Sequence, residues 1–145
     1  MSSTSEQSPQ TKAIMAWAQG FIDSDIDQIA AALHPDYIHD TFPRSLKIPR
    51  QNKEQWVESY RKIKDVLKNF KVDIHSMTEI PGKVFIHATD YADTTVGVPF
   101  VNEATLVVEI APNEDGELKV KHVEEFLDSQ FTAEFMKAVQ PSRDS

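Results

Sequence analysis

The order of the segments constrains this fold more than any other feature of the sequence. Helical patterns come first, and from Phe70 to Leu127 the chain then reads as strand after strand, broken only by short turns. A long antiparallel sheet must bury one face, and the N-terminal helices are the material available to cover it. We therefore predict an α+β domain in which a curved antiparallel sheet bends over its helices and leaves a pocket.

The element boundaries follow from apolar periodicity and from capping and turn residues. The predicted helices are residues 11–22, a short helix capped by Asp25 and ended at His34-Pro35, residues 52–69, and a C-terminal helix starting at residue 128 or 129. The predicted strands are residues 36–42, 70–80, 83–94, 101–110 and 117–127. Asn52 and Gln55 form a capping box at the start of the third helix.

Length and charge limit the class of protein. With 145 residues the chain is one domain, here residues 11–139, between a disordered N-terminal tail (residues 1–10) and a C-terminal tail (residues 140–145). A net charge of −8 argues against nucleic acid or an anionic membrane as a partner. No signal sequence or membrane-spanning run is present, so we expect a cytoplasmic protein.

The face of each strand follows from alternation along it. In the strand 83–94, Asp90 shares the inward face with Ala88 and other apolar residues, and Asn102 lies on the inward face of the next strand. The last strand is ambiguous, because its apolar residues do not select a face. A bulge near His122 would switch its faces, so either Glu124 or Glu125 can point into the pocket.

The opposite face of the sheet is not cleanly polar. Phe85, Tyr91 and Val107 point outward on this assignment. Packing two copies through this face would bury these side chains, so we expect a homodimer.

A pair of carboxyl groups is the first candidate for chemistry. Asp90 and Glu125, or Asp90 and Glu124, would lie in one apolar pocket and push each other's pKa apart, which yields one acid and one base. The alternative is that each carboxylate ends a strand at the surface. A second candidate is Tyr37 with His39, two residues apart on one strand face and able to hold a water or a carbonyl oxygen, unless they are core.

The remaining candidates would line the pocket and bind substrate, and they are Trp17, Trp56, Tyr60, Ala88, Asn102, His122 and Glu124. We expect His122 to act as a proton shuttle or as a hydrogen-bond partner, and Trp17, Trp56 and Tyr60 to form the pocket wall or the core. No HxH or HExxH spacing supports a metal, and four glycines argue against a dinucleotide site, so no cofactor is predicted. The absence of cysteine excludes thiolate chemistry.

The order of elements resembles the NTF2-like superfamily, and within it the SnoaL-like group. The segments that carry the resemblance are residues 33–37, the block of strands, and residues 118–120 leading to residues 125–128. The resemblance implies a cone-shaped α+β barrel with a cofactor-free pocket for a small hydrophobic molecule. Members include polyketide cyclases, ketosteroid isomerase, scytalone dehydratase and limonene epoxide hydrolase.

The resemblance also assigns residues. Tyr37-Ile38-His39 matches the Tyr-x-polar strand of the epoxide hydrolase group, with His39 where an amide usually stands. Ala88-Thr89-Asp90 matches its Arg-x-Asp strand, with the aspartate kept and the arginine lost, which argues against epoxide hydrolysis. The acid that precedes an aromatic residue in the last strand falls at Glu125, so the resemblance favours Glu125 over Glu124. The pocket histidine of the cyclases would fall near Leu106 and is absent.

Two hypotheses of function follow. The first is a SnoaL-like enzyme of secondary metabolism that isomerises, dehydrates, cyclises or opens an epoxide in a hydrophobic substrate, with Glu125 as base and Asp90 as acid. The second is a non-catalytic module for ligand binding or dimerisation. A cavity of a few hundred Å³ into which both acids converge favours the enzyme, and a filled core favours the module.

Overall fold

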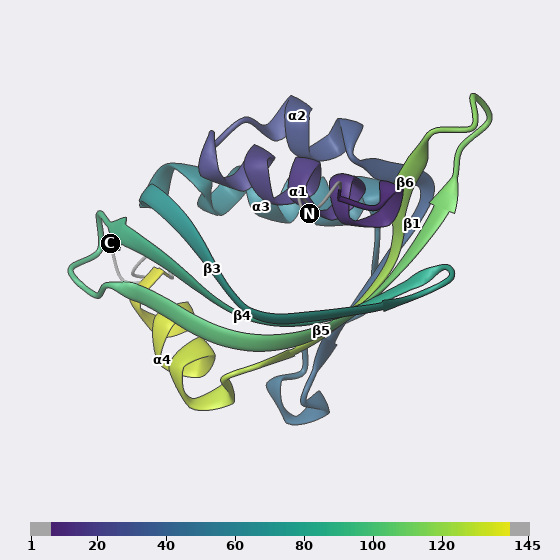
Figure 1. Ribbon diagram of the computed structural model, residues 1–145. Helices are drawn as coiled ribbons and strands as arrows, with labels where there is room; N and C mark the ends of the chain where they lie inside the picture. The colour runs from purple at the N-terminus through teal and green to yellow at the C-terminus, as the bar shows by residue number, and fades with distance from the viewer. Residues whose placement is uncertain (1–6, 140–145) are drawn as a thin grey trace, which may run out of the picture.

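A curved sheet of six strands, covered on its concave face by three helices, forms the framework of the chain (Figure 1). The computed structural model describes residues 7–139. The helices are α1 (Pro9–Ile22), α2 (Ile26–Ala31), α3 (Lys53–Ile63) and α4 (Ser129–Val139). The strands are β1 (Leu33–Phe42), β2 (Gln51–Asn52), β3 (Leu67–Ile80), β4 (Lys83–Thr94), β5 (Phe100–Pro112) and β6 (Leu118–Leu127). The α+β class is confirmed.

The strand order in the sheet is β2-β1-β6-β5-β4-β3. Strands β3 to β6 form an antiparallel meander, as predicted, but β1 pairs parallel with β6, with Asp40 opposite Glu124. The sheet is therefore mixed, and the expectation of a wholly antiparallel sheet is wrong on this point. Alternation along a strand reports which face is buried, and it does not report the direction of a neighbour that is distant in sequence.

Three helix boundaries differ from the prediction. Helix α2 ends at Ala31, earlier than predicted, because β1 begins at Leu33. Helix α1 begins at Pro9, inside the segment predicted to be a tail, because Ser8 caps it by accepting a hydrogen bond from the Thr11 backbone N–H. Residues 1–6 and 140–145, where the rest of the two predicted tails falls, lie outside the described residues. Helix α3 has the predicted capping box but ends at Ile63, since pairing with β4 draws Leu67 into β3.

The inward faces of β4 and β5 are as predicted. Val84 and Val108 are fully buried, and Ile86 and Ala88 nearly so, against Ile14 and Ile29 of the helices. On the other face, Phe85 and Tyr91 are 40% and 39% exposed. The homodimer through this face stays a prediction. Among residues 7–139, no helix is long and apolar enough to cross a membrane.

A bulge in β6 settles the face of its acidic residues. Glu109 pairs with His122 while Ile110 pairs with Val120, so Lys121 is an extra residue between them. Both Val120 and Val123 are consequently buried, although they are three residues apart. Beyond the bulge Glu125 points inward and Glu124 outward, so the structure selects Glu125 from the two alternatives that the sequence left open.

Gly20 allows the close approach of α1 to α2. A Cβ atom on Gly20 would lie 2.7 Å from Ile29 Cγ1 and 2.9 Å from the Ile29 backbone nitrogen. Because the backbone cannot yield as a side chain can, we expect Gly20→Ala to lower the free energy of unfolding by about 1–2 kcal/mol despite the better helix propensity of alanine. Urea unfolding measures this, with Lys12→Ala on the exposed face of α1 as the control. A gain in stability would contradict the tight contact.

Candidate active site

A cavity of about 150 Å³ lies between the helices and the concave face of the sheet. Its walls are mostly hydrocarbon and aromatic rings, with three side chains that can exchange a proton: His39, Asp90 and Glu125. They come from β1, β4 and β6 respectively, so the sheet itself fixes their spacing. The remaining lining residues are Ile14, Trp17, Ala18, Phe21, Trp56, Phe70, Val72, Ile74, Ile86, Ala88, Ala104 and Leu106.

A chain of hydrogen bonds runs from Tyr37 through His39 to Glu125. The carboxylate of Glu125 can only accept, so Nε2 of His39 carries a proton and donates it to Glu125 Oε1 at 3.1 Å. In the neutral ring Nδ1 is then an acceptor, and the Tyr37 hydroxyl donates to it at 2.6 Å. This chain fixes the orientation of the His39 ring and of the Glu125 carboxyl group relative to each other.

Tyr37 lies beneath this chain rather than in the cavity. Its side chain is 1% exposed. Burial, and secondarily the charge of Glu125, raise the pKa of Tyr37 well above its ordinary value. The phenol therefore stays protonated and serves as a fixed donor. The sequence predicted direct contact of Tyr37 with a water or substrate, but the structure places His39 between Tyr37 and the cavity.

Asp90 faces Glu125 across the apolar cavity. Desolvation by burial, and secondarily the charge of Glu125, raise the pKa of Asp90 from its ordinary 3.8 to about 7. Near neutral pH a large share of Asp90 is thus protonated while Glu125 accepts from His39. A protonated carboxyl group thus lies in the same cavity as a second carboxyl group that accepts a hydrogen bond, and general acid–base chemistry can use such a pair.

Aromatic rings form the walls of the cavity next to these groups. The His39 ring stacks on Trp56 with centroids 6.2 Å apart, and Trp56 stacks on Tyr60 at 5.5 Å. Trp17, Trp56 and Ala88 line the cavity, so their roles in binding stay predictions. Tyr60 lies behind Trp56 and is absent from the lining, because stacking on Trp56 packs it into the core. Its expected contact with substrate is corrected to a supporting position.

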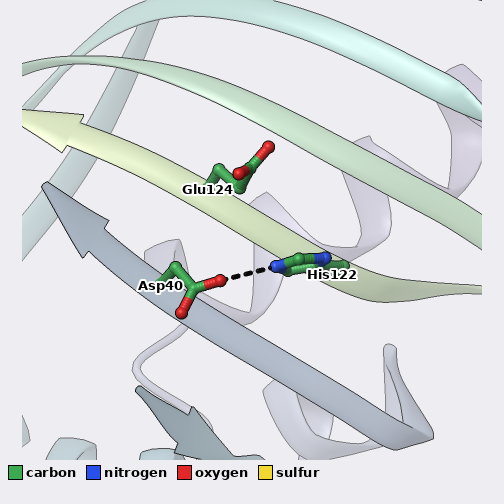
Figure 2. Close-up of side chains that lie close together, drawn as sticks. All are labelled: Asp40, His122 and Glu124. Atoms are coloured by element: carbon green, nitrogen blue, oxygen red, sulfur yellow. Dashed lines mark hydrogen bonds and ion pairs between the residues drawn. The ribbon is translucent and has the colours of Figure 1, made fainter. Parts of the chain in front are cut away.

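His122 and Glu124 do not face the cavity (Figure 2). The bulge turns both to the outer face of β6, where Nε2 of His122 donates to Asp40 Oδ2 at 2.8 Å. Arg50 donates to both oxygens of Asp40, at 2.8 and 3.0 Å. The predicted role of His122 as a pocket shuttle, and that of Glu124 as a pocket acid, are therefore wrong.

The same outward cluster offers atoms for a metal ion. Single ligand atoms of Asp40, His122 and Glu124 lie within 4.8 Å of one another. The guanidinium of Arg50 already holds Asp40, and this hydrogen bond is the main reason why the pKa of Asp40 is lowered to about 2. We interpret the cluster as an ion-pair network that ties the loop before β2 to the sheet.

Two features were missed by the sequence analysis or misplaced by it. Phe70 was assigned to the start of a strand, and its role in the cavity wall carries no local signal. Asn102 was expected to contact substrate, but it is 8% exposed and absent from the cavity lining, because it is packed beside Asp90.

Comparison with known proteins gives relatives but no matching family model. The chain is 28% identical over 135 residues to the monooxygenase ptaG of Pestalotiopsis fici, covering 92% of each chain. It is 30% identical over 108 residues to the monooxygenase dmxR10 of Cryptosporiopsis sp., covering 72% of this chain and 70% of the relative.

Solved structures share the fold. The BvnE pinacolase of Penicillium brevicompactum superposes with a TM-score of 0.73 at 24% identity, covering 90% of this chain and 96% of that chain. PrhC of Penicillium brasilianum gives a TM-score of 0.75 at 20% identity over 91% and 90% of the two chains. A SnoaL-like polyketide cyclase fold from Shewanella denitrificans gives 0.71 at 6% identity over 91% and 99%.

Proposed function

The chain shares the fold of the SnoaL-like proteins of the NTF2-like superfamily and belongs to one family with the monooxygenase dmxR10 of Cryptosporiopsis sp.. From this premise we propose that it is an enzyme that performs acid–base chemistry on a small hydrophobic molecule. The observation that carries the proposal is the pairing of Asp90 and Glu125 in one apolar cavity. A carboxyl group kept protonated by burial and a second carboxyl group that accepts a hydrogen bond from His39 can serve as acid and base.

The proposed reaction moves two protons. Glu125 removes a proton from an acidic C–H of the substrate, and Asp90 donates its proton to the oxygen on which negative charge develops. The enol, or the cyclised, dehydrated or isomerised product formed from it, then leaves the cavity. Proton exchange with solvent returns Asp90 to its protonated form and removes the proton from Glu125. Tyr37 and His39 keep the Glu125 carboxylate aimed into the cavity throughout.

The size of the cavity limits what reacts inside it. About 150 Å³ accommodates one six-membered ring, and this is smaller than the few hundred Å³ expected from the sequence. We infer that the reacting ring enters the cavity and that any larger part of the substrate extends through the opening. The aromatic walls favour a flat, unsaturated ring.

The names of two relatives favour a second candidate. Both are called monooxygenases. Glu125 could also start an oxygenation. A carbanion that Glu125 forms on an electron-rich ring can react with molecular oxygen to give a hydroperoxide. The hydroperoxide then loses water to leave a ketone. Both candidates begin with proton removal by Glu125, and oxygen uptake distinguishes them.

The first step can be tested without knowing the natural substrate. The ring of 5-nitrobenzisoxazole opens to a coloured phenolate when a base removes its C3 proton, and its two fused rings test the cavity and its opening. We expect saturable ring opening by the protein, faster than by an equal concentration of acetate by a factor of about 10² or more. A rate equal to that of acetate would favour the non-catalytic module.

A further inference from the structure

Asn102 carries a polar atom that the cavity chemistry leaves unexplained. The side chain is 8% exposed, and its Oδ1 is shielded from solvent with no hydrogen-bond partner among the described residues. A buried amide oxygen that stays unpaired destabilises the fold, so such an atom calls for a donor nearby. Because solvent cannot reach Oδ1, a substrate in the cavity is not that donor.

The residue directly opposite Asn102 is Asp90. The two are paired in register between β5 and β4, on the inward face of the sheet. Side chains at directly opposite positions of an antiparallel pair have Cβ atoms about 4.5–5.5 Å apart, within reach of a hydrogen bond between a carboxyl and an amide. A carboxylate has no hydrogen to donate, whereas a protonated carboxyl group has one.

The other neighbours of Asp90 do not offer Asn102 a donor. On the β3 side Asp90 is paired with Val72, which is apolar. The charged or titratable groups that share its cavity are Glu125 of β6 and His39 of β1, and they bind each other. Trp17 of α1 carries an indole N–H that is also buried without a partner among residues 7–139, so this donor does not reach Oδ1 of Asn102. Trp56 of α3 lines the cavity beside His39.

We propose that Asn102 is a positioning residue whose Oδ1 accepts a hydrogen bond from the protonated Asp90 carboxyl group. This hydrogen bond keeps Asp90 protonated in the enzyme without substrate. When a substrate oxygen enters the cavity, the Asp90 O–H rotates away from Asn102 and donates its hydrogen bond to the substrate oxygen. The inference deepens the proposed function and rests on it.

The test uses the fact that Asn102 itself does not titrate. Asn102→Leu keeps the size of the side chain and removes the acceptor. We expect it to lower Tm by about 3–6 °C at pH 5.5, where Asp90 is protonated, and to leave Tm unchanged or raised at pH 8.5, where Asp90 is ionised. In an Asp90→Asn background this dependence on pH should vanish. Thr132→Val is the matched control, because Thr132 Oγ1 is also buried without a hydrogen-bond partner within residues 7–139.

Each outcome is decisive. A Tm change of equal size at both pH values would overturn the role of Asn102. So would a pH dependence that persists in the Asp90→Asn background, or one that Thr132→Val reproduces. These results would leave the acid–base pair intact. A different measurement tests the proposed function itself. If the Asp90→Asn protein is no more stable than the parent at pH 8.5, Asp90 is not the buried acid.

Discussion

Replacing Asp90 by asparagine is expected to raise the free energy of unfolding at pH 8.5 by about 2–4 kcal/mol. The same substitution removes the proposed general acid. Burial raises the pKa of Asp90 from its ordinary 3.8 to about 7, and each unit corresponds to about 1.4 kcal/mol. At pH 8.5 the folded protein must hold a charged carboxylate in an apolar cavity beside Glu125. The neutral amide removes that penalty.

The sign follows from proton linkage. With a raised pKa, folded Asp90 retains its proton between about pH 4 and 7, where the unfolded chain has already lost it. The stability contributed by the protonated group is complete below about pH 4 and is lost as pH rises through 7. Parent and Asp90→Asn should therefore be nearly equally stable near pH 4 and diverge above it, which urea unfolding at a series of pH values measures.

Asp40 provides a control of opposite sign. Arg50 and His122 lower the pKa of Asp40 to about 2, so its charged form stabilises the fold at neutral pH. Asp40→Asn should consequently destabilise the protein at pH 8.5. If Asp90→Asn behaves like Asp40→Asn, Asp90 is an ordinary ion-paired or solvated carboxylate, and its role as an acid is lost.

The second large effect is expected at the proposed base. Glu125→Gln should slow the ring opening of 5-nitrobenzisoxazole by about 10²–10⁴-fold, because an amide cannot accept the proton. His39 can still donate to the amide oxygen, so the hydrogen-bonded chain and the fold should persist. Initial rates at saturating probe, together with circular dichroism to verify folding, measure this.

Glu124→Gln is the matched control for this prediction. The substitution is chemically identical and lies one residue away, but the side chain points to the outer face of β6 (Figure 2). Its rate should equal that of the parent within a factor of two or so. Equal losses in the two variants would mean that the faces of β6 are assigned incorrectly, and no loss in either would mean that Glu125 is not the base.

Much of this architecture could be predicted from local patterns. Alternation placed Asp90 on the buried face of β4 because its neighbours Ala88 and Ile86 are apolar, and the capping box of Asn52 and Gln55 located the start of α3. A bulge near His122 was one of two alternatives, because the apolar residues of the last strand do not select a face, and the structure contains this bulge. These features depend on residues close together in the chain.

The errors concern contacts between distant segments. The parallel pairing of β1 with β6 joins elements at opposite ends of the sequence, and it brings Asp40 beside His122 on the outer face. Tyr60 and Asn102 have residue types suited to a pocket, and only packing against Trp56 and pairing with Asp90 remove them from it. Side-chain direction was predictable for β4 and β5, whereas the direction in β6 and the second layer behind the cavity were not.

The protonation of Asp90 is the claim on which this account depends most. Titration of its side-chain carbon by NMR, in the parent and in Glu125→Gln, measures it directly. We expect a midpoint near pH 7 in the parent, and a lower one, still above the ordinary 3.8, in Glu125→Gln, since burial is the larger cause and the charge of Glu125 the smaller. A midpoint near 4 in the parent would contradict the account.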